Sequence, residues 1–282
     1  MSTFRTLRFV ERELSIENYD DLLTRKRHDL LTCCRSLPDK ATVIQTCGGC
    51  LRLIMDMSAF SHGKATTNVD FKNVVSVAEE AAFDLFLPKT LQEALAEACN
   101  YLTLGVDVYH EDGSCDTHAE LVGVYDTRGG CFVAWTGKSY PVQFQTSSLM
   151  YCKDLESHFL TLSGVSVMLL GCHDLNIFSP RSRASASQGT YKDQIMNKMD
   201  RLVKIHDPVV VLHHPHYTDS PRIWRVPWTG VDRNVPYCDT YSSGIFYGAG
   251  DGGKPRGRLE EVLAKTAKGD VKNWIQDLPK IS

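Results

Sequence analysis

Apolar residues recur along the chain with two different spacings, and their alternation predicts a mixed α/β fold. Residues 16–35 and 69–82 carry apolar side chains three or four positions apart, the spacing of an amphipathic helix. Residues 92–101 are rich in Ala, Leu and Glu and are also predicted to be helical. Residues 41–46 and 102–109 have the β-branched and aromatic composition of strands. The first part of the chain therefore alternates between strands and helices.

The same alternation continues to about residue 212. Further short runs with strand composition are predicted at residues 83–88, 120–125, 131–135, 165–171 and 208–212. A Thr-Arg-Gly-Gly turn after residue 126 predicts an antiparallel hairpin, and residues 191–205 have helical spacing. Because no linker or repeat interrupts this pattern, we expect a helical extension at residues 1–38 and one α/β domain at residues 39–282.

Composition and charge narrow the class of protein. The chain has 282 residues, 43% of them hydrophobic and 23% charged, with 31 Lys and Arg against 34 Asp and Glu. These proportions are typical of a folded globular protein, and they provide no excess positive charge to attract nucleic acid. No apolar run approaches the roughly 20 residues of a membrane span, and the first 21 residues lack the apolar core of a signal peptide. We expect a cytoplasmic protein that binds neither nucleic acid nor membrane.

Ten cysteines are scattered along the chain, and in a reducing compartment they are predicted to be thiols. The closest spaced pair that is not adjacent is Cys47 and Cys50, which follow Cys33 and Cys34. Four thiolates form tetrahedral zinc sites. A zinc site at these four residues is therefore an alternative to buried thiols, although adjacent cysteines rarely bind one metal.

The segment after the predicted strand at residues 165–171 carries the most informative chemistry. Cys172, His173 and Asp174 follow Gly171 directly. Open α/β sheets bind ligands beyond the carboxyl ends of their strands. A thiol at such a position, with a histidine beside it, can ionise and act as a nucleophile. The alternative is that Cys172 is a small buried apolar residue, as free cysteine often is.

Cys172-His-Asp-Leu175, with Phe178 and Pro180 after it, resembles the Cys-x-Asp-Leu motif of the nitrilase (carbon–nitrogen hydrolase) superfamily. Weaker matches extend the resemblance over about residues 40–250. It implies a four-layer αββα sandwich with mixed sheets and a homodimer or larger homo-oligomer. It also implies hydrolysis or acyl transfer on a small amide through a cysteine thioester, without a cofactor.

The resemblance implies a role for several single residues. Cys172 corresponds to the nucleophile, Lys138 to the group that stabilises the oxyanion, and Glu156 to the auxiliary glutamate of the family. Lys89 stands where the family has its general-base glutamate, and a lysine takes a proton from a thiol only if its pKa falls to near neutrality. His173 is therefore a candidate substitute base.

Glu93, one helical turn after Lys89, is the other candidate substitute. If neither residue accepts the proton, the chain is expected to be an inactive binding protein with the nitrilase fold. Enzymatic activity is the favoured interpretation.

A competing arrangement follows the predicted strand at residues 208–212. His213, His214, His216 and Asp219 have the ligand types of hydrolytic zinc or iron, whose bound water would then be the nucleophile. Otherwise these histidines bond to loop carbonyls or line a substrate pocket. The metal-dependent hydrolase remains an alternative, and no metal is included in the favoured interpretation.

Five residues are predicted to bind the substrate: Asp174, Arg181, His214, His216 and Trp224. Arg181 follows the cysteine segment. Trp224 belongs to residues 221–228, where two arginines alternate with two tryptophans. This combination suits a planar anionic ligand or an aromatic cluster at a subunit interface.

Overall fold

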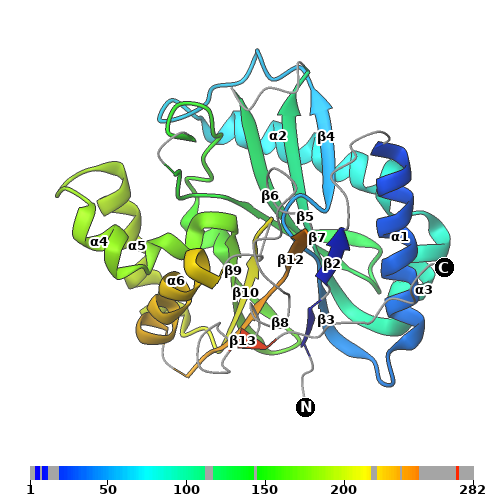
Figure 1. Cartoon of the computed structure of the whole chain (residues 1–282). Coiled ribbons are helices and arrows are strands. Elements are labelled where there is room, and N and C mark those ends of the chain that lie inside the picture. The colour runs from blue at the N-terminus through cyan, green and yellow to red at the C-terminus, as the bar shows by residue number, and fades with distance from the viewer. Residues whose placement is uncertain are drawn as a thin grey trace.

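Two mixed β-sheets face each other in the computed structural model, which describes residues 4–6, 8–11, 19–111, 117–142, 145–216, 221–235, 237–247 and 271–272 (Figure 1). The first sheet has the order β1 (Phe4–Thr6), β3 (Ala41–Gln45), β5 (Cys99–His110), β6 (His118–Asp126) and β7 (Cys131–Gly137), with β4 (Leu51–Met55) paired to β5. The second has the order β13 (Val271–Lys272), β11 (Asp239–Ser242), β10 (Val210–His214), β9 (Val165–Gly171) and β8 (Phe159–Leu162). Strands β2 (Arg8–Glu11) and β12 (Gly244–Tyr247) form a separate parallel pair.

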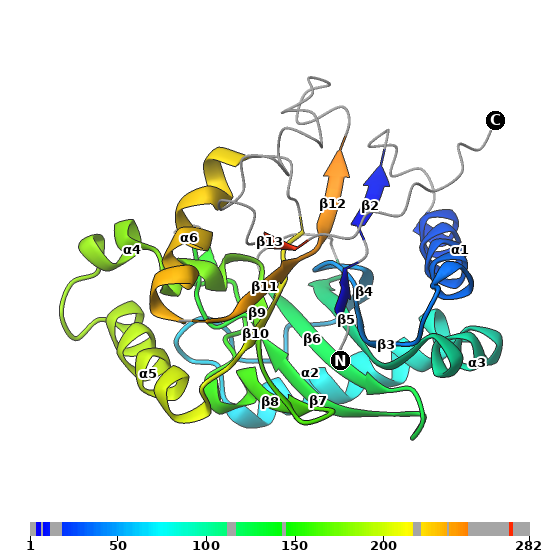
Figure 2. The same cartoon turned by 90° about the horizontal axis from the view of Figure 1, so that it is seen from below.

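Helices cover the outer face of each sheet, which gives four layers (Figure 2). On the first sheet these are α1 (Tyr19–Ser36), α2 (Asn68–Ala81) and α3 (Lys89–Ala98). On the second they are α5 (Tyr191–His206) and α6 (Pro221–Asn234), and the short helix α4 (Pro180–Ser185) lies beside α6. The αββα sandwich predicted from the sequence is therefore confirmed.

Alternate strand residues supply separate cores. In β6, Leu121 packs under the helices of the first sheet, whereas Val122 faces the second sheet. In β10, Val211 belongs to the core under α5 and α6, whereas Leu212 lies between the sheets. Successive side chains of a strand point to opposite faces. This alternation also fixes where the polar residues at the strand ends point.

The structure differs from the sequence prediction in several segments. Residues 83–88 do not form a strand, because α2 continues into the π-helical turn η1 (Ala82–Phe86), where the Leu87 N–H donates to the Ala82 carbonyl at 2.9 Å. Residues 221–234 form helix α6 although they include Pro227. Residues 4–6 form β1 of the first sheet, so the expected extension at residues 1–38 is not purely helical.

None of the helices in the described ranges is both long enough and apolar enough to cross a membrane.

Candidate active site

Two carboxylates meet on neighbouring strands of the first sheet. Asp107 on β5 and Glu120 on β6 are directly opposite in the antiparallel register, so their side chains share one face. Lys138 follows the end of β7, and its backbone N–H donates to the backbone carbonyl of Glu120 at 2.8 Å. All three side chains are buried. The central strands of the first sheet thus place two acids and one base side by side.

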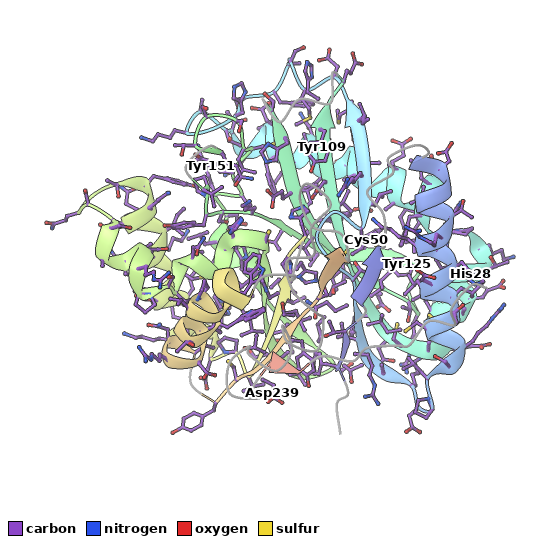
Figure 3. The ribbon with its side chains drawn as sticks, viewed as in Figure 1. His28, Cys50, Tyr109, Tyr125, Tyr151 and Asp239 are labelled. Atoms are coloured by element: carbon purple, nitrogen blue, oxygen red, sulfur yellow. The ribbon has the colours of Figure 1, made fainter. Side chains whose placement is uncertain are left out.

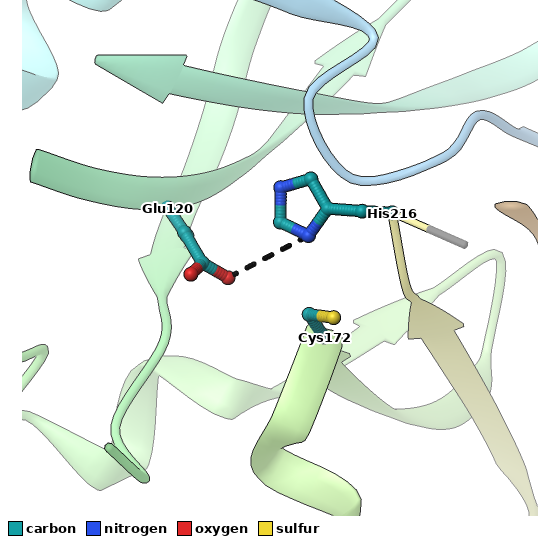
Figure 4. A group of neighbouring side chains, drawn as sticks. All are labelled: Glu120, Cys172 and His216. Atoms are coloured by element: carbon teal, nitrogen blue, oxygen red, sulfur yellow. Dashed lines mark ion pairs between the residues drawn. The ribbon is translucent and has the colours of Figure 1, made fainter. Parts of the chain in front are cut away.

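The second sheet supplies a thiol and an imidazole to the same place. Cys172 is the first residue of the 3₁₀ helix η4 (Cys172–Ile177), directly after β9, and His216 follows β10. The Cys172 Sγ, one Glu120 oxygen and one His216 nitrogen all lie within 4.8 Å of one another (Figure 4). Cys172 is 6% exposed. We call Asp107, Glu120, Lys138, Cys172 and His216 the Cys172 cluster.

Glu120 and Lys138 form a buried ion pair. The Lys138 Nζ donates to Glu120 Oε1 at 2.6 Å, and the Gln145 Nε2 donates to the same oxygen at 2.9 Å. Burial would raise the pKa of Glu120, but the Lys138 ammonium, His216 and the hydrogen bonds from His118 and Lys138 together outweigh burial and hold this pKa well below its ordinary value. Burial by itself would lower the pKa of Lys138, because it disfavours the charged ammonium. The Glu120 carboxylate and Cys172 more than offset this effect, so the pKa of Lys138 is raised. Both groups are therefore charged at neutral pH.

The second Glu120 oxygen faces the rest of the cluster. Oε2 is buried without a hydrogen-bond partner in the described ranges, and it lies 3.9 Å from His216 Nδ1. The other ring nitrogen of His216, Nε2, lies 2.7 Å from Asp107 Oδ2. Burial lowers the pKa of His216, but Asp107, Cys172 and Glu120 outweigh it, so the pKa stands well above its ordinary value.

Asp174 holds the chain on both sides of the cluster. Its Oδ1 accepts the backbone N–H groups of Ser139 and Tyr140 at 3.0 and 2.8 Å, and its Oδ2 accepts that of Gly171 at 3.0 Å. The side chain is fully buried, and burial raises its pKa. Asp174 thus ties the segment after Lys138 to the turn that presents Cys172. These contacts indicate a positioning role in place of the substrate contact predicted from the sequence.

The three histidines after residue 212 diverge because they alternate along a strand. His213 points toward α6, with Nε2 donating to the Cys172 carbonyl at 2.7 Å. His214 points between the sheets, with Nε2 2.9 Å from Thr103 Oγ1, and burial lowers its pKa to about 4. His216 alone joins the Cys172 cluster. The structure therefore does not bring these histidines into one metal site, and Asp219 lies outside the described residues.

Two of the remaining predicted residues lie near the cluster. His173 follows Cys172 and stacks on Trp224, with ring centroids 5.3 Å apart. Burial, reinforced by the Lys138 charge, lowers the pKa of His173 to about 4. Trp224 is buried in the core under α6. Arg181 is exposed at the start of α4.

The structure places three predicted acid–base residues away from the cluster. Glu156 Oε2 pairs with His206 Nε2 at 2.7 Å, and the Glu156 side chain is 55% exposed. Lys89 and Glu93 are exposed on α3, in the helical layer outside the first sheet. Glu93 lines a cavity of about 570 Å³ beside the end of α1. The structure brings none of these three side chains to Cys172.

The four cysteines considered for zinc do not form a ligand set. Cys33, Cys34, Cys47 and Cys50 are buried thiols. In the part of the chain that the structure describes, only Glu120, Cys172 and His216 form a group of three potential metal ligands within 4.8 Å. The Lys138 ammonium already neutralises Glu120, and the raised pKa of His216 favours a proton there. We therefore assign no metal to the cluster.

Asp107 and Glu120 are site residues that the sequence analysis did not identify. Each is a charged residue within a strand whose neighbours are apolar, Val106 and Val108 in one case and Ala119 and Leu121 in the other. A buried charge usually needs a partner or a function. An isolated acidic residue within an otherwise apolar strand was therefore the sequence feature that could have identified Asp107 and Glu120 as site residues.

Comparisons with known proteins identify structural neighbours only. No protein-family model and no curated protein matches this chain. The chain is similar to a solved structure of a variant of the amidase from Nesterenkonia AN1, described as belonging to the nitrilase superfamily. That match has a TM-score of 0.47 at 11% identity and covers 86% of this chain and 76% of the other. A second structure of the Nesterenkonia sp. AN1 amidase, with acrylamide added at its active-site cysteine, has a TM-score of 0.42 at 11% identity over 87% and 79% of the two chains. The fold assignment rests on the layers and cores described above.

Proposed function

We propose that this protein is a cysteine hydrolase or acyltransferase that cleaves the carbon–nitrogen bond of a small amide through a thioester on Cys172. The observation that carries the proposal is the position of the Cys172 sulfur within 4.8 Å of a carboxylate oxygen and an imidazole nitrogen. A structural thiol needs no such neighbours, because burial among apolar groups suffices for it. The motif around Cys172 resembles that of the nitrilase superfamily, which supports the same chemistry.

Each step of the proposed reaction has a group to assist it. The Cys172 thiolate attacks the amide carbonyl carbon, and the electron pair of the carbonyl π bond moves to oxygen. Lys138 provides a buried ammonium near Cys172 to stabilise this oxyanion, and Glu120 keeps Lys138 protonated and in place. The C–N bond then breaks, the amine leaves with a proton, and water or another acceptor cleaves the thioester.

The test compares Cys172→Ala with a parent that carries Cys131→Ser. Cys131 is an exposed thiol at the start of β7, and its removal prevents adducts at this surface thiol from being confused with adducts at Cys172. We expect the parent to release ammonia from members of a panel of small primary amides and to form a thioester adduct visible by intact mass. Cys172→Ala should reduce turnover to the level of a blank.

Turnover by Cys172→Ala at the parent rate would contradict the proposal. If no amide is hydrolysed but some of them raise the melting temperature, an inactive binding protein is the better interpretation. If a chelator abolishes parent turnover and zinc restores it, a metal-dependent hydrolase is favoured instead.

A further inference from the structure

We propose that His216, oriented by Asp107, accepts the Cys172 thiol proton and delivers it to the leaving amine, so that the site works through a Cys172–His216–Asp107 arrangement. This inference rests on the proposed function and names the proton carrier that the proposed function leaves open. From the sequence, His216 was expected to bind the substrate, with metal ligation as the alternative.

The geometry of His216 suits a proton carrier. Its Nε2 lies 2.7 Å from Asp107 Oδ2, a distance typical of a charge-assisted hydrogen bond. A carboxylate at Nε2 fixes the proton on that nitrogen and leaves Nδ1 to exchange a proton with a partner. Nδ1 faces Glu120 Oε2 at 3.9 Å, and the thiol belongs to the same group of atoms within 4.8 Å (Figure 4). The nucleophile Cys172, the base His216 and the orienting carboxylate Asp107 thus lie next to one another in that spatial order.

Glu120 is less suited to carry the proton. Its Oε1 already accepts from Lys138 and Gln145 at 2.6 and 2.9 Å. A carboxylate paired with an ammonium binds a proton weakly, because protonation would break the ion pair. Its oxygen Oε2 can instead stabilise the positive charge that forms on His216. We therefore assign Glu120 to positioning Lys138 and to electrostatic support of the imidazolium.

A tight loop holds the His216–Asp107 pair in place. Gly49 has φ +59°, and a Cβ there would lie 2.6 Å from Asp107 Oδ2 and 3.0 Å from the His216 Cδ2. The Gly48 N–H donates at 3.1 Å to the carbonyl of Pro215, which is the residue before His216. Tyr109, labelled in Figure 3, donates its hydroxyl to Asp107 Oδ2 at 3.0 Å. Such support restricts both side chains to the geometry that proton transfer needs.

Several titratable groups lie around His216. Against the effect of burial, Asp107 on β5, Cys172 on η4 and Glu120 on β6 raise its pKa and favour the imidazolium. Tyr109 is hydrogen-bonded to Asp107, and His118 and Lys138 lie beside Glu120. Burial lowers the pKa of His173 and raises that of Cys47, and the charge of His216 acts to lower both. The closest contact, to Asp107, is with a carboxylate.

The proton balance of the proposed reaction closes on His216. The thiol S–H bond breaks and an N–H bond forms at Nδ1, giving a thiolate and an imidazolium. After attack, the Nδ1 proton passes to the amide nitrogen as the C–N bond breaks. Water then gives one proton to Nδ1 and its hydroxyl to the thioester carbon, and the sulfur leaves as thiolate and recovers the proton. The net reaction converts an amide and water to a carboxylic acid and an amine.

The experiment measures the alkylation rate of Cys172 by iodoacetamide between pH 5.5 and 9 in the Cys131→Ser parent, with the modified peptide quantified by mass spectrometry. An ordinary thiol, with a pKa of about 8.5, reacts poorly at pH 6. We expect the parent to remain reactive at pH 6 and His216→Asn to lose at least about tenfold there. Glu156→Gln, which removes a carboxylate that pairs with His206 away from the cluster, is the matched control and should keep the reactivity at pH 6. Glu120→Gln should lower the reactivity less than His216→Asn does. Asp107→Asn should change it in the same direction as His216→Asn.

Retained reactivity at pH 6 in His216→Asn, or its absence in the parent, overturns the inference. If Glu120→Gln loses the reactivity at pH 6 while His216→Asn retains it, Glu120 and not His216 accepts the thiol proton. His216→Gln, checked by its melting temperature, replaces His216→Asn if that variant does not fold, and the same criteria apply. Because alkylation needs no substrate, the alkylation result is independent of the amide panel. If the parent forms a thioester but the alkylation rate of Cys172 does not depend on His216, only the inference about His216 is contradicted and the proposed function stands.

Discussion

Buried thiols occur in two settings in this protein, and the comparison shows what makes one of them a candidate nucleophile. Cys33, Cys34 and Cys99 pack in the core between the first sheet and its helices. Burial raises the pKa of Cys33 and of Cys34 to about 12, and that of Cys99 further. Cys172 is also buried, but a carboxylate oxygen and an imidazole nitrogen lie within 4.8 Å of its sulfur. Burial alone suppresses ionisation of a thiol, whereas burial among charges can support it.

The largest expected effect is a difference in reactivity between these thiols. In the folded protein at pH 7, we expect iodoacetamide to alkylate Cys172 at least about 100-fold faster than Cys34, because a thiol with a pKa near 12 holds almost no thiolate. Peptide mapping after timed quenching measures both rates in one sample. Equal rates would remove the distinction between the two settings. In 6 M guanidinium chloride the difference should disappear, because unfolding exposes both thiols.

A smaller effect is expected from Gly49→Ala. A Cβ at Gly49 would lie 2.6 Å from Asp107 Oδ2, so we expect kcat for amide hydrolysis to fall about tenfold through displacement of the His216–Asp107 pair. Gly164→Ala is the matched control, since Gly164 also has positive φ but has nothing within 4 Å of the added carbon. Both variants should lose about 1–2 kcal/mol of unfolding free energy from backbone strain.

Urea unfolding and amide turnover, measured on both variants, separate the two effects. If Gly164→Ala reduces kcat as much as Gly49→Ala does, the loss reflects general destabilisation and not the contact with Asp107.

The fold was largely predictable because its signals are local. The continuous apolar runs of β9 and β10 and the helical spacing of α2 and α5 are visible in the sequence. Helix α6 was not predicted because residues 221–228 were noted only for their alternating arginines and tryptophans, although Trp224, Trp228 and Val231 recur at helical spacing. The π-helical turn η1 was missed because a short apolar run fits a strand equally well.

The candidate site was only partly predictable, because it depends on the register between distant segments. Cys172 and Lys138 carried a recognisable motif or position. By contrast, the alignment of Asp107 with Glu120 requires the pairing of β5 and β6, and the approach of His216 to Asp107 requires the two sheets to pack face to face. A spacing in one chain does not specify either contact. The base that we propose, His216, therefore lies 44 positions after the cysteine, whereas the sequence suggested His173 or Glu93.

The smallest effect is expected from Glu156→Gln, which tests whether position in the sequence or position in space assigns a role. The family resemblance gives Glu156 an auxiliary catalytic role, yet its carboxylate pairs with His206 and is 55% exposed. An exposed ion pair contributes at most about 1 kcal/mol to stability. We therefore expect less than a twofold change in kcat/KM for amide hydrolysis, and a small decrease in melting temperature at low salt that disappears at high salt. A loss of tenfold or more in kcat/KM, without a matching loss of stability, would instead place Glu156 among the groups that act on Cys172.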